Sequence, residues 1–362
     1  MKDLILFGDC RESLKTIATS DTKARMCVTS PPYYGLRDYG TATWIGGDPN
    51  CNHRRDTKVK PENCNTGHKN HDEMAGVGDA IYKTVCPKCG AIRQDSQIGL
   101  EQTPEDYVKE MVKVFSLVRD CLTDDGTLWL NIGDSYYNYR SDGNYPKQTV
   151  SKTRQDLPQS TPVRGNKLEG LKQKDLIGIP WMLAFALRAD GWYLRQDIIW
   201  HKPNPMPESV KDRCTKAHEY IFLLSKSKNY YYDNEAIKEP AKDWGTRDRT
   251  NGKYHNTGTG LQPHSGLTKS YERKNKRSVW SVTVKPYKGA HFATYPEELV
   301  EPCILAGSEK GDIVLDPFMG SGTTAMVAKK NSRSYLGCEL REEYASLQTA
   351  RISSIPNKLP LY

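Results

Sequence analysis

Two stretches of this chain combine residue types that suit group-transfer chemistry, and the first is Ser30-Pro31-Pro32-Tyr33. Its prolines fix φ and lack N–H donors, so they predict a rigid, extended turn whose backbone carbonyls stay free to accept hydrogen bonds. Ser30 Oγ and the Pro31 carbonyl can accept both protons of an exocyclic amine while Tyr33 stacks on the base. We therefore predict that these four residues are catalytic; the alternative is a structural Pro-Pro turn.

The chemistry explains why two acceptors are needed. An aryl amine is a poor nucleophile because its lone pair is delocalised into the ring. Hydrogen bonds to its protons favour a pyramidal nitrogen whose lone pair points at a methyl donor. Direct displacement then depends on proximity and alignment, so no covalent adduct and no nucleophilic cysteine are expected.

The second stretch is a glycine loop, residues 316–323, that follows an apolar run and precedes a helix start. Such a loop brings backbone N–H groups close to a ligand. Glu339 ends the next strand, where an acid meets ribose hydroxyls in Rossmann-like folds. No Gly-Lys-Ser/Thr is present, and two acids without a lysine suit the sulfonium of S-adenosylmethionine better than a triphosphate. The predicted cofactor-binding residues here are Asp316, Phe318, Gly320, Ser321, Gly322, Thr323 and Glu339; the alternative is an ordinary strand-to-helix turn.

A third group of residues has the composition of a structural zinc site. Cys51-x-His53 and Cys86-Pro-x-Cys89-Gly supply four soft ligands, as tetrahedral zinc requires. The polar loop between the pairs has too little apolar surface to fold without such a ligand. The alternatives are free thiols on a loop, or a different ligand in place of His53, chosen from Cys64, His68 and His71.

The elements that must position these groups alternate between strand and helix. Short runs rich in β-branched residues predict strands at Leu4 to Phe7, Met26 to Thr29, Thr127 to Asn131, Tyr193 to Trp200, Tyr220 to Leu224, Ile313 to Leu315 and Ser334 to Cys338. Helices are predicted at Pro104 to Leu122, where Thr103 is the N-cap, and at Asp175 to Ala189, Glu297 to Leu305 and Thr323 to Lys329. This order predicts a doubly wound, mainly parallel α/β sheet with both faces covered.

Polar stretches interrupt that pattern and predict insertions. The expected catalytic domain comprises residues 1–49, 98–233 and 288–362, with a zinc-binding insertion at 50–97 and a target-recognition region at 234–287. Between Lys202 and Lys288 there are 18 Lys and Arg residues against 9 Asp and Glu, interleaved with aromatic residues, and the whole chain carries a net charge of +8. This composition suits a polyanionic partner and base stacking. Candidate readers of guanine edges or phosphates are Arg247, Arg249, Arg273 and Arg277; a preformed module and a loop ordered by DNA both remain open.

No signal peptide or long apolar segment is evident, so we expect an intracellular, cytoplasmic protein without a membrane partner. The ten cysteines are scattered except at positions 86 and 89, which favours metal or core thiols over a disulfide framework.

Taken together, Thr-Ser-Pro-Pro-Tyr and Asp-Pro-Phe-Met-Gly-Ser-Gly-Thr-Thr resemble the amino-methyltransferases of DNA. The catalytic motif precedes the cofactor loop. This order resembles that of the beta class, in which the usual Rossmann-like methyltransferase fold is circularly permuted. The resemblance implies that Asp9, in Gly8-Asp9, contacts the cofactor adenine, and that Thr294 and Pro296 belong to a segment holding the methionine end. Segments 126–134 and 195–207 also resemble family segments, and the resemblance implies that the latter lies near the flipped base.

Members with Ser at the first position of the tetrapeptide mostly methylate cytosine N4, and those with Asp mostly adenine N6. Ser30 therefore favours cytosine N4 in double-stranded DNA, with adenine N6 as the alternative. Two other classes stay open: a non-catalytic zinc-dependent DNA-binding protein, and an amino-methyltransferase of RNA or protein. The sequence also leaves open whether a second copy of the chain or a cognate restriction endonuclease is a partner.

Overall fold

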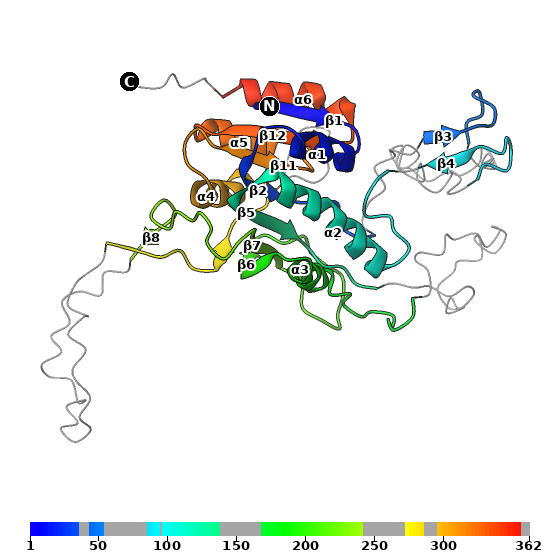
Figure 1. The fold of residues 1–362 in the computed structure, drawn as a ribbon. Helices are drawn as coiled ribbons and strands as arrows, with labels where there is room; N and C mark the ends of the chain where they lie inside the picture. The colour runs from blue at the N-terminus through cyan, green and yellow to red at the C-terminus, as the bar shows by residue number, and fades with distance from the viewer. Residues whose placement is uncertain are drawn as a thin grey trace, which may run out of the picture.

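The computed structural model describes residues 1–35, 43–53, 85–94, 96–137, 168–241, 272–285 and 295–355. Its centre is an eight-stranded sheet (Figure 1). All neighbouring strands are parallel except around β7, which is antiparallel to both of its neighbours. Across the sheet the order is β1 (Leu4–Phe7), β12 (Ser334–Glu339), β11 (Ile313–Asp316), β2 (Ala24–Thr29), β5 (Leu122–Ile132), β7 (His218–Ser225), β6 (Tyr193–His201) and β10 (Val279–Ser281).

Helices cover both faces of this sheet, as expected of a doubly wound fold. On one face lie α1 (Cys10–Ala18), α2 (Pro104–Cys121) and α3 (Ile179–Ala189), which pack around Leu14, Phe115 and Leu183. On the other face lie α4 (Glu297–Gly307) and α5 (Thr323–Lys330), which pack against Trp129. A 3-10 turn, η2 (Glu342–Tyr344), leads into α6 (Ala345–Ser353), which packs on α5. The mainly parallel α/β architecture is therefore confirmed.

All seven predicted strands are present, and the helix starts show why some boundaries were predictable. Thr103 caps α2 by accepting a hydrogen bond from Asp106 N at 3.1 Å, as predicted. The helix predicted to begin at Asp175 begins instead at Ile179. Its cap comes from a distant residue: Asp134 accepts hydrogen bonds from Gly178 N and Ile179 N at 3.0 and 3.2 Å. Local sequence carries no sign of such a cap.

Two small antiparallel hairpins lie outside the main sheet. One pairs β3 (Thr43–Ile45) with β4 (Ile92–Gln94), so it begins before residue 50, the predicted start of the zinc-binding insertion. The other pairs β8 (Glu239–Pro240) with β9 (Arg273–Lys274). β10 also falls in the range predicted for target recognition, yet it extends the main sheet beside β6. Part of residues 234–287 therefore belongs to the main sheet.

Among the helices of the described segments, none combines the length and the apolar character needed to cross a bilayer.

Candidate active site and candidate metal centre

The two sequence motifs leave adjacent strands at the same edge of the sheet. β2 and β11 are parallel neighbours, with Met26 opposite Val314 and Cys27 opposite Leu315. The Ser-Pro-Pro-Tyr turn follows β2 directly, and the glycine loop follows β11 directly. Stretches almost 300 residues apart in sequence are thus brought together where ligands bind to open α/β sheets.

A buried carboxylate joins the two motifs. Asp316 is fully buried, and its Oδ1 accepts hydrogen bonds from Thr29 Oγ1 at 2.6 Å and from Phe318 N at 3.0 Å. Its Oδ2 accepts from Thr324 Oγ1 at 2.5 Å and from Tyr295 OH at 3.1 Å. Burial raises the pKa of Asp316, and these four donors oppose that rise. The carboxylate therefore fixes the loop to the Ser-Pro-Pro-Tyr turn, and protein atoms cover it completely.

The glycine loop is closed by an acid from β12. Gly320 and Gly322 have φ of +54° and +83°, a conformation that side chains disfavour. Glu339 Oε2 accepts from Gly320 N at 2.7 Å, and its Oε1 accepts from Arg341 N at 2.9 Å. The Glu339 side chain lies at the carboxyl end of its strand, and burial raises its pKa to about 7. The acid predicted to meet ribose hydroxyls is thus held against the loop itself.

Helix α6 supports the loop from its far side, which the sequence reasoning missed. Gln348 Nε2 donates to Gly320 O at 2.7 Å. The Arg351 guanidinium donates to Ser321 O at 3.1 Å, Ser321 Oγ at 2.5 Å and Thr323 Oγ1 at 3.0 Å. Gln348 and Arg351 are three residues apart and share one face of the helix, a weak signal that could have suggested a common target.

Asp9 lies beside the end of β12. Gly8 N donates to Glu339 O at 2.9 Å, which aligns the two strand ends. Asp9 caps α1 by accepting from Arg11 N at 2.9 Å, and it also pairs with the Arg11 guanidinium. Burial acts to raise the pKa of Asp9, but the hydrogen bonds from Arg11 outweigh it and lower the pKa. The carboxylate predicted to meet adenine therefore lies at the same edge of the sheet as Glu339. Thr294, predicted to hold the methionine end, lies outside the described residues.

The Tyr33 phenol of the Ser-Pro-Pro-Tyr turn points at a polar cluster. Its hydroxyl donates to Glu219 Oε2 at 2.7 Å and lies 3.3 Å from Asn131 Oδ1. Gly133 is required beside the ring, because a Cβ there would lie 2.7 Å from Tyr33 Cε2. Tyr107 OH secures the turn by donating to Pro32 O at 2.9 Å. Glu219 and Asn131 come from β7 and β5, and sequence reasoning named neither as a site residue.

The four predicted metal ligands do converge. Ligand atoms of Cys51, His53, Cys86 and Cys89 all lie within 4.8 Å of one another. Cys51 Sγ is 3.8 Å from Cys86 Sγ, and Cys89 Sγ is 3.5 Å from His53 Nδ1. A tetrahedral zinc with Zn–S of about 2.3 Å and Zn–N of about 2.0–2.1 Å separates two sulfurs by about 3.8 Å and a sulfur and a nitrogen by about 3.6 Å. The residues present fit zinc without rearrangement.

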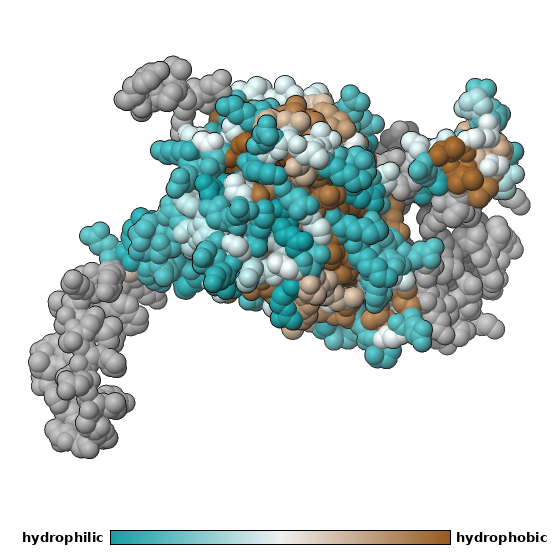
Figure 2. Space-filling view, viewed as in Figure 1, coloured by the Kyte–Doolittle hydropathy of each residue, from teal (hydrophilic) through white to brown (hydrophobic). Residues whose placement is uncertain are grey.

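The surroundings of these ligands also suit a metal. Trp44 stacks on the His53 ring at a centroid distance of 4.2 Å and fixes its plane. A hydrogen bond from Ala91 N, with a second from the backbone at Asp48, lowers the pKa of the Cys89 thiol and so favours the thiolate that zinc binds. Elsewhere the hairpin buries little: Ile45 and Ile92, opposite each other in the register, are 56% and 58% exposed. Figure 2 shows hydrophobic surface over the part of the molecule where β3 and β4 lie. The spare candidates Cys64, His68 and His71 lie outside the described residues.

The basic residues predicted to read DNA are only partly described. Arg247 and Arg249 lie outside the described residues. Arg273 donates to Lys238 O at 3.0 Å, and Arg277 pairs with Glu239 at 2.6 Å while its side chain stays 74% exposed. Both support the β8–β9 hairpin, and the exposed Arg277 guanidinium keeps most of its surface open to a partner.

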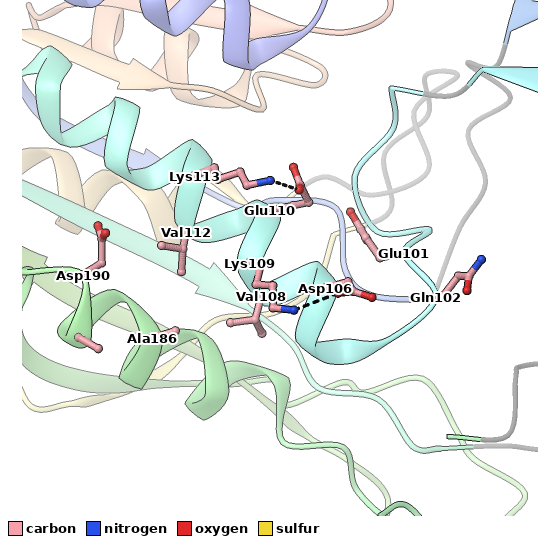
Figure 3. Close-up of a pocket in the computed structure, with 11 residues that line it drawn as sticks. Glu101, Gln102, Asp106, Val108, Lys109, Glu110, Val112, Lys113, Ala186 and Asp190 are labelled. Carbon is pink, nitrogen blue, oxygen red and sulfur yellow. Dashed lines mark hydrogen bonds and ion pairs between the residues drawn. The ribbon is translucent and has the colours of Figure 1, made fainter. Parts of the chain in front are cut away.

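A pocket of about 880 Å³ between α2 and α3 is a different feature. Figure 3 shows it flanked by two ion pairs of α2, Lys109 with Asp106 and Lys113 with Glu110. Its lining includes no residue of the Ser-Pro-Pro-Tyr turn, the glycine loop or the Cys/His cluster. It therefore lies apart from the candidate site.

Comparisons with known proteins agree with this geometry. A family model for N6/N4 methyltransferases, described as DNA methylase, matches residues 24–350. The chain is 41% identical over 353 residues to the type II methyltransferase M.SmaI of Serratia marcescens, covering 96% of this chain and 90% of that protein. It is 40% identical over 345 residues to the type II methyltransferase M.Cfr9I of Citrobacter freundii, covering 95% and 86%. The solved structure of the PvuII DNA methyltransferase, described as cytosine-N4-specific, shares the fold with a TM-score of 0.53 at 14% identity, covering 99% of this chain and 88% of that one. The chain therefore belongs to the N6/N4 DNA methylase family.

Proposed function

We propose that this protein is a site-specific DNA methyltransferase that moves the methyl group of S-adenosylmethionine to the exocyclic amine of a flipped base, the N4 of cytosine. The observation that carries the proposal is the hydrogen bond of 2.6 Å between Thr29 and Asp316. It ties a turn suited to holding an amine to a loop suited to holding the methyl donor. The order of the two motifs along the chain supports the circularly permuted class.

In this proposal the residues divide the work as follows. Ser30 Oγ and the Pro31 carbonyl accept the amine protons, and Pro32 and Tyr33 shape the turn around the base. Asp9, Thr294, Phe318 and the loop from Gly320 to Thr323 hold the methyl donor, with Glu339 accepting from its ribose hydroxyls. Asp316 acts by fixing the loop, since it has no surface left for a ligand. When bound, S-adenosylmethionine supplies an electrophilic methyl group on a sulfonium.

We prefer cytosine N4 because of one residue: Ser30, and not an Asp, occupies the first position of the tetrapeptide. Adenine N6 is the alternative, and the same experiment separates them. Because the similar M.SmaI and M.Cfr9I are type II methyltransferases, we infer that double-stranded DNA is the substrate and that the protein serves a restriction-modification system with a cognate endonuclease.

A structural zinc ion is the second part of the proposal. Cys51, His53, Cys86 and Cys89 would supply all four ligands, so no position is left for a substrate and the ion would act on folding alone. The insertion leaves the catalytic turn and returns to it, since Gly35 N donates to Gly99 O at 2.9 Å. A metal-fixed hairpin would therefore steady the chain that continues from Tyr33.

The deciding experiment measures labelled methyl transfer from S-adenosylmethionine to DNA, RNA and protein, followed by sequencing of the methylated DNA. We expect transfer to DNA, at cytosine N4 within one short sequence. Pro31→Ala and Tyr33→Ala should abolish transfer, whereas Lys109→Ala, on an exposed side chain of α2, should not change it. Full-rate transfer by either turn variant would refute the catalytic assignment; sequence-specific DNA binding without transfer would favour the zinc-dependent binding protein.

A further inference from the structure

The loop between β6 and β7, residues 202–217, presents Met206 to solvent. Its side chain is 86% exposed, more than that of any other large hydrophobic residue that the structure describes. A single exposed apolar residue is common on protein surfaces, so exposure alone assigns no role. Met206 is distinguished by the rigidity of its backbone and by its place in the fold.

Prolines and a side-chain anchor fix the backbone on both sides of Met206. Residues 203, 205 and 207 are prolines, which set their own φ and keep the residue before each of them extended. Asn204 joins this run to the chain that follows β10. Its Nδ2 donates to Val284 O and its Oδ1 accepts from Val284 N, both at 2.9 Å. The methionine is therefore carried on a stiff, anchored support.

The loop begins at the edge of the sheet where the Ser-Pro-Pro-Tyr turn leaves β2. β5 and β6 are both antiparallel to β7, and β2 is parallel to β5, so the carboxyl ends of β2, β5 and β6 meet at one edge. Lys202, the first residue of the loop, pairs with Glu219, and Glu219 Oε2 accepts from Tyr33 OH at 2.7 Å. Met206 thus follows, by four residues, a side chain that is linked to the proposed base-stacking ring.

The far end of the loop is fixed to the same edge. Lys216 Nζ donates to Asp134 O at 2.6 Å, and the Arg213 guanidinium lies 3.9 Å from the centre of the Tyr136 ring. Asp134 and Tyr136 come directly after the carboxyl end of β5. Because both ends of the loop are tied to this edge, the position of Met206 is set relative to the Ser-Pro-Pro-Tyr turn.

The proposed reaction creates a need for an apolar side chain here. An amine inside a duplex cannot reach the turn, so the target base must leave the stack, which costs stacking and pairing energy. A side chain that enters the gap replaces part of the lost stacking and hinders the return of the base. Methionine is among the apolar side chains that proteins insert between base steps. Its unbranched, polarizable chain also suits an irregular gap.

We propose that Met206 enters the base stack of double-stranded DNA at the position that the flipped base vacates. The inference rests on the proposed function, because only an enzyme that extrudes its target base needs such a residue. Exposed in the free protein, the side chain is covered by the neighbouring base pairs in the complex. This burial offsets part of the cost of unstacking. Met206 takes no part in the methyl transfer itself and acts only on the position of the base.

The test uses two synthetic duplexes that contain the sequence identified by sequencing of the methylated DNA. In one duplex the target base is paired normally, and in the other it faces an abasic site, so that extruding it costs less. Met206→Ala removes the apolar chain, and Met206→Leu keeps it. Val210→Ala, on the same loop and 41% exposed before the change, is the matched control. The measurements are single-turnover methyl transfer, the Kd of S-adenosylmethionine and thermal melting.

We expect Met206→Ala to slow transfer to the paired duplex by about 10- to 100-fold, because truncation loses most of what burying a methionine contributes. On the abasic duplex most of this loss should disappear. Met206→Leu should retain most of the wild-type rate, and Val210→Ala should match the wild type on both duplexes. The Kd of S-adenosylmethionine and the melting temperature should be unchanged in all three variants.

An equal loss on both duplexes would mean that Met206 supports the protein or its DNA contacts in general, and would overturn the insertion. A wild-type rate in Met206→Ala on the paired duplex would overturn it too, as would an equally large loss in Val210→Ala or a lower melting temperature in Met206→Ala. These results would leave the proposed function standing. If the wild-type protein transfers no methyl group to DNA, the proposed function and the insertion both fail.

Discussion

Glu339 makes the proposed cofactor site sensitive to pH near neutrality. Burial raises its pKa from the ordinary 4.5 to about 7, although Arg341 N and Gly320 N donate to it. Protonation places a hydrogen on one carboxylate oxygen and so removes an acceptor position that a ribose hydroxyl could use. We therefore expect S-adenosylmethionine to bind the ionised form more tightly, so that binding strengthens as the pH rises through about 7.

The size of the effect follows from the fraction ionised. With a pKa of about 7, about a tenth of the protein carries ionised Glu339 at pH 6 and about nine tenths at pH 8. The Kd should thus fall by up to about tenfold over this interval, or about 1.4 kcal/mol. In the cofactor-free protein, rising pH has the opposite effect, because it lowers the free energy of unfolding. The folded state holds a proton that the unfolded state has lost between pH 4.5 and about 7, so this group lowers the free energy of unfolding across that window, by about 3 kcal/mol at most.

The assay is calorimetric titration of S-adenosylmethionine at pH 6, 7 and 8, alongside melting curves of the free protein. Glu339→Gln is the comparison, because it keeps the shape and cannot ionise. We expect its Kd to be weaker at pH 8 and to lack the part of the pH slope that Glu339 supplies. The amino group of the cofactor titrates equally with both proteins, so it cancels in the comparison. Equal slopes for wild type and variant would refute the role of Glu339.

Three further predictions concern the supports of the site. Metal analysis of the purified protein should find one zinc per chain, and Cys86→Ala or chelation should lower the melting temperature; metal-free protein that melts like the wild type would remove the zinc proposal. Thr29→Val, nearly isosteric, should lower the free energy of unfolding by about 1.5–3 kcal/mol in denaturant titrations, because it removes a donor to a buried carboxylate, and a change under 0.5 kcal/mol would contradict the account of Asp316. Arg351→Ala should raise the KM for S-adenosylmethionine several-fold with a smaller change in kcat, and Arg351→Lys should restore part of it; an unchanged KM would show that α6 does not support the loop.

The core strands were predictable because their composition reflects their environment. β11 is covered by both helical layers, and a strand buried on two faces must be apolar along its length. Two of the elements that the sequence analysis missed, α6 and β10, lack that signature. α6 buries Gln348 together with Ile352, so its inner face is partly polar and no apolar period marks it. β10 is three residues long and shows only Trp280 as a buried residue.

The motifs of the site were predictable, whereas their partners were not. Proline pairs and glycine loops act through local backbone geometry, which the sequence states directly. Glu219 contacts Tyr33 across 186 residues, and Thr29 contacts Asp316 across 287. Nothing near Glu219 in sequence distinguishes it from a surface acid at a strand start. Only the pairing of β5, β7 and β6 brings it next to Tyr33 and Lys202.

Asp316 couples the position of the Ser-Pro-Pro-Tyr turn to that of the glycine loop. A buried carboxylate that loses one donor stays buried and keeps its desolvation cost, so its remaining donors must shift or the site must open. Thr29 belongs to the strand that carries the catalytic turn, and Thr324 belongs to the helix after the glycine loop. Altering either one therefore disturbs the position of the other. Thr29 is not among the residues proposed to bind the cofactor, yet Thr29→Val should weaken cofactor binding as well as stability, because Asp316 links Thr29 to the glycine loop.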